Sequence, residues 1–175
     1  SASVSFFRRE VAGEVTGFFF NPNIHPFLEY RRRLAGVHDM AHYTRLEVIE
    51  DLTFDPAAWF AALAAAEKGG GPEQPAGALS RCASCLGLRL ARTAEEAAAR
   101  GYAAFSTTLS ISPWQDHEAI QAVGQRAAEI HGVEFSYRDL RDLYSESVRL
   151  SRSWGLYRQK YCGCLVSEWE RYRGR

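Results

Sequence analysis

The sequence predicts an α/β protein with a doubly wound parallel sheet, an apparently missing first strand and a helical C-terminal part. Short segments rich in β-branched and aromatic residues alternate with longer segments whose apolar residues recur at helical spacing. This alternation is typical of parallel strands joined by helices, whose ligands bind outside the carboxyl ends of the strands. A length of 175 residues without an internal repeat predicts a single domain over residues 1–175.

The first elements predict a chain whose beginning is missing. A helix over residues 1–12 would place Val4, Phe7 and Val11 on one face, and residues 14–20 have the composition of a strand. In a parallel α/β fold such a helix follows a strand, yet the sequence starts with neither a strand nor a methionine. We therefore expect the sequence to be incomplete at its N-terminus.

A turn and a helix follow the strand. The segment NPNIHP, residues 21–26, contains two prolines and two asparagines, which favour turns over regular structure. The helix predicted over residues 27–43 should direct Leu34 and Val37 inward and its arginines, residues 31–33, largely outward.

The rest of the chain continues the alternation. Strands are predicted over residues 46–49, 103–108 and 133–136, and helices over residues 56–66, 82–100, 116–131, 143–154 and through Trp169 and Tyr172. The expected core positions on two of these helices are Leu86, Leu90, Ala94 and Ala97, and Ile120, Val123, Ala127 and Ile130. Residues 69–78 hold four glycines and two prolines and predict a flexible loop, either a lid or a surface insertion.

Composition restricts the possible partners. Lys and Arg together number 21, as do Asp and Glu, so the chain lacks a global basic field and any polyanion must meet a local patch. No apolar run reaches the length of about 18 residues typical of a membrane span. We therefore expect a cytoplasmic protein without a membrane partner.

Four cysteines form two closely spaced pairs. Cys82 and Cys85 are one helical turn apart, and Gly163 lets the backbone fold tightly between Cys162 and Cys164. Four thiolates suit a tetrahedral zinc ion or a [4Fe-4S] cluster. The residues alone leave open a metal centre, a redox-active dithiol and unpaired buried cysteines.

Basic residues accompany both pairs. Cys85, Arg89 and Arg92 fall on one helix face, near a helix N-terminus whose dipole favours a thiolate. Residues 141–175 carry eight Lys and Arg against four Asp and Glu, interleaved with aromatic residues. This region predicts either a patch for a polyanion or a solvated helix face over core aromatics.

Four segments in this order resemble the epoxyqueuosine reductases of the QueH type: NPNIHP, RCASCLGLRLARTAEEAAARGY, FSTTLSISP and GLYRQKYCGC. The resemblance covers nearly the whole chain. It implies an adenine-nucleotide-hydrolase-like α/β fold and a tRNA-modification enzyme that reduces the epoxide of epoxyqueuosine at the wobble position to the cyclopentene. It also implies a [4Fe-4S] cluster with an adjacent iron, for which Cys82, Cys85, Cys162 and Cys164 would be ligands.

The sequence departs from that family at its start. The family begins with a strand that ends in a CCxxC-like motif, whereas this sequence begins at Ser1, where the motif should have finished. Either a truncation or serines in place of cysteines, at Ser1 and Ser3, would remove ligands. We expect this form to be depleted of metal or inactive.

The resemblance and the residues together imply a two-electron deoxygenation. The iron would take the epoxide oxygen as a Lewis acid, and the cluster would pass on electrons from an unidentified donor. The candidate proton donors are His25, Tyr157 and Tyr161, although His25 is equally suited to brace its loop by a hydrogen bond.

The wobble base would be read by stacking, worth roughly 1 to 3 kcal/mol per base, and by hydrogen bonds. The expected tRNA contacts are Asn21, Asn23, Arg31, Arg89, Arg92, Thr107, Thr108, Ser110, Ser112, Arg158 and Gln159. The hydroxyl groups among them also suit turn capping.

Two other functions remain open at this point. A zinc-stabilised RNA-binding module would use the same four cysteines without electron transfer. A nucleotide-binding relative of the α/β hydrolases would need a phosphate loop after the first strand, and the glycines at residues 69–71 follow a helix instead.

Overall fold

The computed structural model describes residues 2–11, 13–69 and 78–174. The chain forms two compact units, one of Ser1–Pro56 with Leu143–Arg175 and one of Ala57–Asp142. The first unit thus combines both ends of the chain. The predicted single domain stays a prediction.

The first unit is an α/β structure with parallel strands. It contains α1 (Ala2–Glu10), β1 (Gly17–Phe20), α2 (Phe27–Thr44), β2 (Val48–Asp51), α6 (Tyr144–Ser153) and α7 (Leu165–Tyr172). Strands β1 and β2 pair in parallel from Gly17 with Val48 to Phe20 with Asp51. A core of Phe19, Ile24 and Tyr30 packs against α2 and joins the two elements that flank the turn at residues 21–26.

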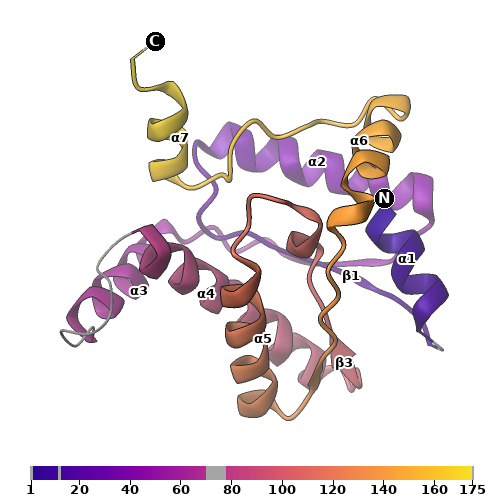
Figure 1. The fold of residues 1–175 in the computed structure, drawn as a ribbon, viewed down its shortest axis with the longest axis horizontal. Coiled ribbons are helices and arrows are strands. Elements are labelled where there is room, and N and C mark those ends of the chain that lie inside the picture. Colours follow the sequence, from indigo (N-terminus) through magenta and orange to yellow (C-terminus); the bar gives the residue numbers. More distant parts are fainter. Residues whose placement is uncertain (1, 12, 70–77, 175) are drawn as a thin grey trace. The chain divides into compact units, whose positions relative to one another are not determined.

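The second unit is built on two packed helices. It contains α3 (Pro56–Gly69), α4 (Ala78–Ala99), β3 (Ala104–Phe105), the 3-10 helix η1 (Thr108–Ile111), α5 (His117–His131), β4 (Glu134–Phe135) and η2 (Arg141–Leu143), which leads into α6. Figure 1 shows α4 beside α5, and these two helices share the core of this unit. The four residues predicted to face the core from α4 are all buried: Leu86, Leu90, Ala94 and Ala97.

One predicted core position on α5 is wrong. Ile130 is 66% exposed, whereas Ile120, Gly124 and Ala128 are buried. The reason is a close approach at Gly124, where an added Cβ would lie 2.1 Å from Cε1 of Phe135. Because β4 packs against the face that carries Gly124, Ile130 is left in solvent.

The parallel pairing predicted from the alternation of elements is confirmed, since β3 also pairs with β4 in parallel. Among the described residues, the strands form two separate pairs. The doubly wound sheet stays a prediction. Gly69 ends α3 and Ala78 begins α4, and the rest of the loop predicted there, residues 70–77, lies outside the described residues.

Within the part of the chain that the structure describes, no helix has both the length and the apolar character needed to cross a membrane.

Candidate functional site

The second cysteine pair lies in an irregular stretch, the CGC segment (residues 162–164), that is attached to α2 by one arginine. The Arg33 guanidinium donates from Nη1 to the carbonyl oxygen of Cys162 at 2.6 Å and from Nη2 to that of Tyr161 at 2.9 Å. Figure 1 accordingly shows the chain between α6 and α7 running beside α2. Arg33 was predicted to point outward, and this is wrong: its side chain is only 10% exposed.

A buried carboxylate holds Arg33 in place. Glu29, one helical turn earlier, accepts from Nε of Arg33 at 2.9 Å, and its side chain is 5% exposed. Its second carboxylate oxygen accepts the hydroxyl of Tyr157 at 2.5 Å. Both oxygens of the buried charge therefore have partners, which is the condition for burying an ion pair without a large desolvation loss.

The turn at residues 21–26 is also bonded to the CGC segment. The amide of His25 donates to the carbonyl of Gly163 at 2.7 Å, and the hydroxyl of Tyr161 donates to the carbonyl of His25 at 2.6 Å. Gly163 has a φ of +123°, and an added Cβ would lie 2.7 Å from Nη1 of Arg33. The expected need for glycine between the two cysteines is confirmed.

His25 forms a pair with a carboxylate from α7. Its Nδ1 lies 2.5 Å from Oε2 of Glu168, and its side chain is 48% exposed. Because a carboxylate accepts, Nδ1 carries the hydrogen and Nε2 is the nitrogen left for another partner. The loop-bracing interaction of His25 is thus present, through its backbone as well as its ring.

The two tyrosines in the site keep their protons at neutral pH. Burial, followed by the charges of Glu168 and Glu29, raises the pKa of Tyr161 to about 12. Burial and the hydrogen bond to Glu29 raise the pKa of Tyr157 above its usual value. Each hydroxyl donates its proton within the protein, to His25 or to Glu29.

Cys164 caps the N-terminus of α7. Its Sγ accepts from the amide of Ser167 at 3.4 Å, and the hydroxyl of Ser167 accepts from the amide of Gly163 at 3.1 Å. Cys162 is exposed and Cys164 half-buried. Two thiols separated by one residue, one of them accepting an N–H hydrogen bond, are suited to bind a metal centre, because the sulfur ligands of such centres are commonly hydrogen-bonded.

The first cysteine pair belongs to the other unit. Cys82 and Cys85 lie on consecutive turns of α4, and the helix begins at Ala78, earlier than predicted. The helix start predicted near Cys82 is therefore wrong, and the pair lies beyond the first turn of α4. The dipole effect expected on these thiols stays a prediction. No group of three or more His, Cys, Asp or Glu side chains gathers among the described residues, and the four-thiolate set stays a prediction.

The predicted tRNA contacts differ in accessibility. Arg31, Arg158, Gln159 and Thr108 are exposed, and Asn21 and Arg89 are half-buried. Asn23 is only 3% exposed. Arg92 forms ion pairs with Glu96 at 2.7 Å and Glu95 at 3.5 Å on its own helix. Their contact with tRNA stays a prediction.

The hydroxyls of the TTLSISP segment make local hydrogen bonds. Thr107 accepts from the amide of Leu109 at 3.2 Å, and the buried Ser110 donates to the carbonyl of Thr107 at 3.1 Å. Ser112 accepts from the amide of Trp114 at 3.3 Å. The turn-capping role anticipated for these groups is confirmed, and a contact with ribose or phosphate stays a prediction.

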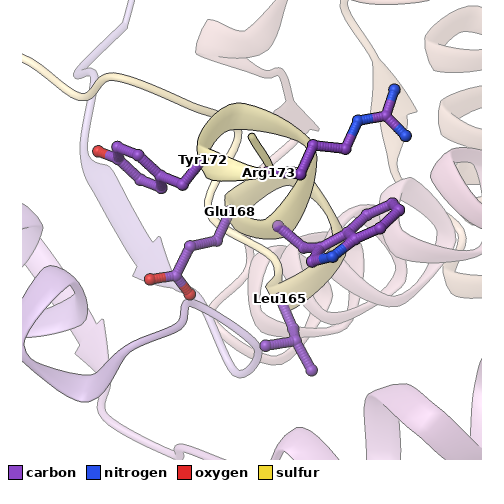
Figure 2. Close-up of a pocket in the computed structure, with 5 residues that line it drawn as sticks. Leu165, Glu168, Tyr172 and Arg173 are labelled. Atoms are coloured by element: carbon purple, nitrogen blue, oxygen red, sulfur yellow. The ribbon is translucent and has the colours of Figure 1, made fainter. Parts of the chain in front are cut away.

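A shallow depression runs along α7. It is lined by Leu165, Glu168, Trp169, Tyr172 and Arg173. Figure 2 shows Glu168 and Tyr172 leaving the helix on one side and Leu165 and Arg173 on the other. Trp169 is 59% exposed, and the Arg173 guanidinium lies 4.9 Å from its ring centroid.

Sequence reasoning missed Glu29 and Glu168 and misplaced Arg33. The spacing of Glu29 and Arg33, with the acid four residues before the base on a predicted helix, is a signal for an ion pair. It does not tell a buried pair from an exposed one. Glu168 has no comparable signal, because its partner His25 lies 143 positions away.

Comparisons with known proteins match most of the chain. The family model described as epoxyqueuosine reductase QueH matches residues 2–170. A protein of that name from Dehalococcoides mccartyi is 37% identical over 158 residues, which cover 90% of this chain and 81% of the relative. One from Thermotoga maritima is 39% identical over 158 residues, with 88% and 79% covered. The chain therefore belongs to the epoxyqueuosine reductase QueH family, a family of oxidoreductases.

Proposed function

We propose that this protein reduces epoxyqueuosine to queuosine at the wobble position of tRNA. The observation that carries the proposal is the family match over residues 2–170. In the reaction two C–O bonds of the epoxide break and a C=C bond forms. Two electrons and two protons are consumed, and the oxygen leaves as water. The reaction therefore needs an electron source, proton donors and a site for the modified base.

The proposed electron source is a [4Fe-4S] cluster with an adjacent iron, held by Cys82, Cys85, Cys162 and Cys164. When bound, the cluster supplies single electrons and the iron a Lewis acid. Two features of the chain support these ligands. The CGC segment offers two thiols around Gly163, and α4 offers two thiols one turn apart. Thiolate donors are the ligands that iron–sulfur clusters prefer.

We assign the proton donation to His25. Its Nδ1 donates to Glu168, which fixes the ring and leaves Nε2 on a side chain that is 48% exposed. Tyr157 and Tyr161 are weaker candidates, because each donates its proton to an acceptor within the protein. In this assignment the two tyrosines orient the segment. His25 in its doubly protonated form delivers one proton from Nε2, is protonated again from solvent and delivers the second.

The proposed tRNA face of the first unit contains Arg31, Arg158, Gln159 and the exposed Trp169 on α7. Exposed aromatic and guanidinium groups suit the stacking of unpaired bases in an anticodon loop. A tRNA substrate also implies work in the cytoplasm, with an electron donor to be identified. We further propose a doubly wound parallel sheet of the adenine-nucleotide-hydrolase-like kind, supported by the parallel pairing within each of the two strand pairs.

The test is anaerobic reconstitution of the full-length protein with iron and sulfide, followed by incubation with dithionite and tRNA that carries epoxyqueuosine. We expect visible absorption that bleaches on reduction, and queuosine among the digested nucleosides by mass spectrometry. Cys164→Ser should lower both signals, whereas Ser153→Ala, a surface change in the same unit, should leave them unchanged. A colourless protein with stoichiometric zinc that binds tRNA would instead establish the RNA-binding module.

A further inference from the structure

Three consecutive carbonyl groups around the second cysteine pair accept hydrogen bonds from α2 and from the turn that precedes it. Those of Tyr161 and Cys162 accept from Arg33, and that of Gly163 accepts from the amide of His25. We propose that Arg33, supported by Glu29, is a positioning residue that fixes the CGC segment before any metal binds.

The geometry of the guanidinium explains how one side chain can set the position of a thiol. The carbonyl of Tyr161 belongs to the peptide plane before Cys162, and the carbonyl of Cys162 belongs to the plane after it. Arg33 bonds both at 2.9 Å and 2.6 Å, so both planes are held and the backbone angles of Cys162 are fixed. The direction of its Cα–Cβ bond follows from those angles. A planar guanidinium with several N–H groups can span two acceptors, whereas a lysine ammonium is a point charge.

The same guanidinium defines the next residue. A Cβ added at residue 163 would lie 2.7 Å from Nη1 of Arg33, so only glycine allows this close approach. The carbonyl of Gly163 accepts the amide of His25 at 2.7 Å, and this bond fixes the peptide plane that precedes Cys164. Both cysteines thus receive their backbone direction from the α2 side of the unit.

The buried acid makes Arg33 rigid. Nε of Arg33 donates to Glu29 at 2.9 Å, and the other carboxylate oxygen accepts from Tyr157 at 2.5 Å. The Arg33 guanidinium also lies 5.7 Å from the ring centroid of Tyr161. A buried ion pair often contributes little net stability compared with apolar residues, so the role of this pair in the proposal is the conformation that it specifies.

The inference rests on the proposed function only where it concerns metal, because the positioning can be measured on the metal-free full chain. The first measurement is hydrogen exchange at the amide of His25, which is bonded to Gly163. The second is the alkylation rate of Cys164 by iodoacetamide, resolved by mass spectrometry. Cys85 is an internal control, because it is also half-buried and lies on α4.

The main variant is the double substitution Glu29→Gln with Arg33→Gln, which leaves no unpaired buried charge. We expect the His25 amide to exchange and Cys164 to react at least about tenfold faster, because the charge-assisted hydrogen bonds are lost. The alkylation rate of Cys85 should stay within about twofold of its rate in the parent protein. Arg32→Gln, an exposed neighbour on α2, is the matched control and should change neither rate by more than about twofold.

Arg33→Lys separates positioning from charge. It keeps the cation beside Glu29 but cannot span both carbonyls, so we expect intermediate rates and a partial rescue relative to the double variant. If the double variant unfolds, the rates of Arg33→Lys decide the question. Rates equal to those of the parent protein in Arg33→Lys and in a folded double variant would overturn the proposal. If the variants exchange and react faster while the parent protein binds no iron, the positioning role is supported. Only the proposed reductase function is then contradicted.

Discussion

The two cysteine pairs are positioned in different ways. Cys82 and Cys85 lie within the 22 residues of α4, so the helix backbone alone sets their spacing. The CGC segment has no regular structure, and its shape depends on side chains of α2 and on the turn before it. The first pair should therefore be disturbed only when its helix loses its packing, whereas the second should respond to single distant side chains.

The largest effect that separates the two pairs is expected from the core beneath α4. Leu90 is 2% exposed and packs with Phe105 and the alanines of α4 and α5. Leu90→Ala should cost about 2 to 5 kcal/mol, since the cavity lies in a closely packed core. Hydrogen exchange should show faster opening of α4. The alkylation rate of Cys85 should rise, whereas that of Cys164 should stay unchanged. Ile130→Ala, on the exposed face of the same unit, should stay within about 0.5 kcal/mol. Equal losses in the two variants would contradict the core described above.

The next effect concerns Gly163. Its φ of +123° and the 2.7 Å approach to Arg33 both oppose a side chain. Gly163→Ala should cost about 1 to 3 kcal/mol from backbone strain and should also displace Arg33 from the carbonyl of Cys162. We expect faster alkylation of Cys164 and a lower thermal midpoint.

Gly155→Ala is the matched control for Gly163→Ala. Gly155 also has a positive φ, +63°, but no atom lies within 4 Å of its added Cβ. It should lower stability by about 1 to 2 kcal/mol without changing the reactivity of Cys164. A change in Cys164 reactivity as large as that in Gly163→Ala would show that the close approach to Arg33 is unimportant.

A smaller effect is expected from Tyr161 at alkaline pH. Its pKa is raised from 10.0 to about 12 in the folded protein. A raised pKa means that the stabilisation is complete below pH 10.0 and is lost as the pH rises through about 12. Thermal unfolding followed by circular dichroism from pH 9 to pH 12 should show a steeper loss in the parent protein than in Tyr161→Phe. Identical slopes would show that this hydroxyl does not stabilise the segment.

The smallest effect is expected from Asp139, in the unit that carries the α4 pair. Hydrogen bonds from Arg141 lower its pKa from 3.8 to about 2. The stabilisation is therefore present above pH 3.8 and is lost as the pH falls through about 2. Because the ion pair of Asp139 and Arg141 is exposed, Asp139→Asn should change acid unfolding only slightly. Neither cysteine pair should react faster at neutral pH. A marked rise in alkylation of Cys85 would contradict this.

Local patterns predicted the second unit better than the first. The apolar spacing on α4 identified all four of its core residues, because helical periodicity is encoded within a few neighbouring positions. The error at Ile130 arose where a distant ring, Phe135, packs on Gly124 and selects the face of α5 that is buried. Arg33 was misplaced for a related reason, since its acceptors lie 128 and 129 positions away.

The sequence by itself determined the one-turn spacing of Cys82 and Cys85, the glycine between Cys162 and Cys164, and the membership of a family through ordered segments. These features depend on local backbone geometry or on residue identity. Only the tertiary structure decided that Glu29 and Arg33 are buried behind the CGC segment and that His25 meets Glu168. An ion pair on a helix is exposed or buried according to what packs over it, and here that covering chain comes from the other end of the sequence.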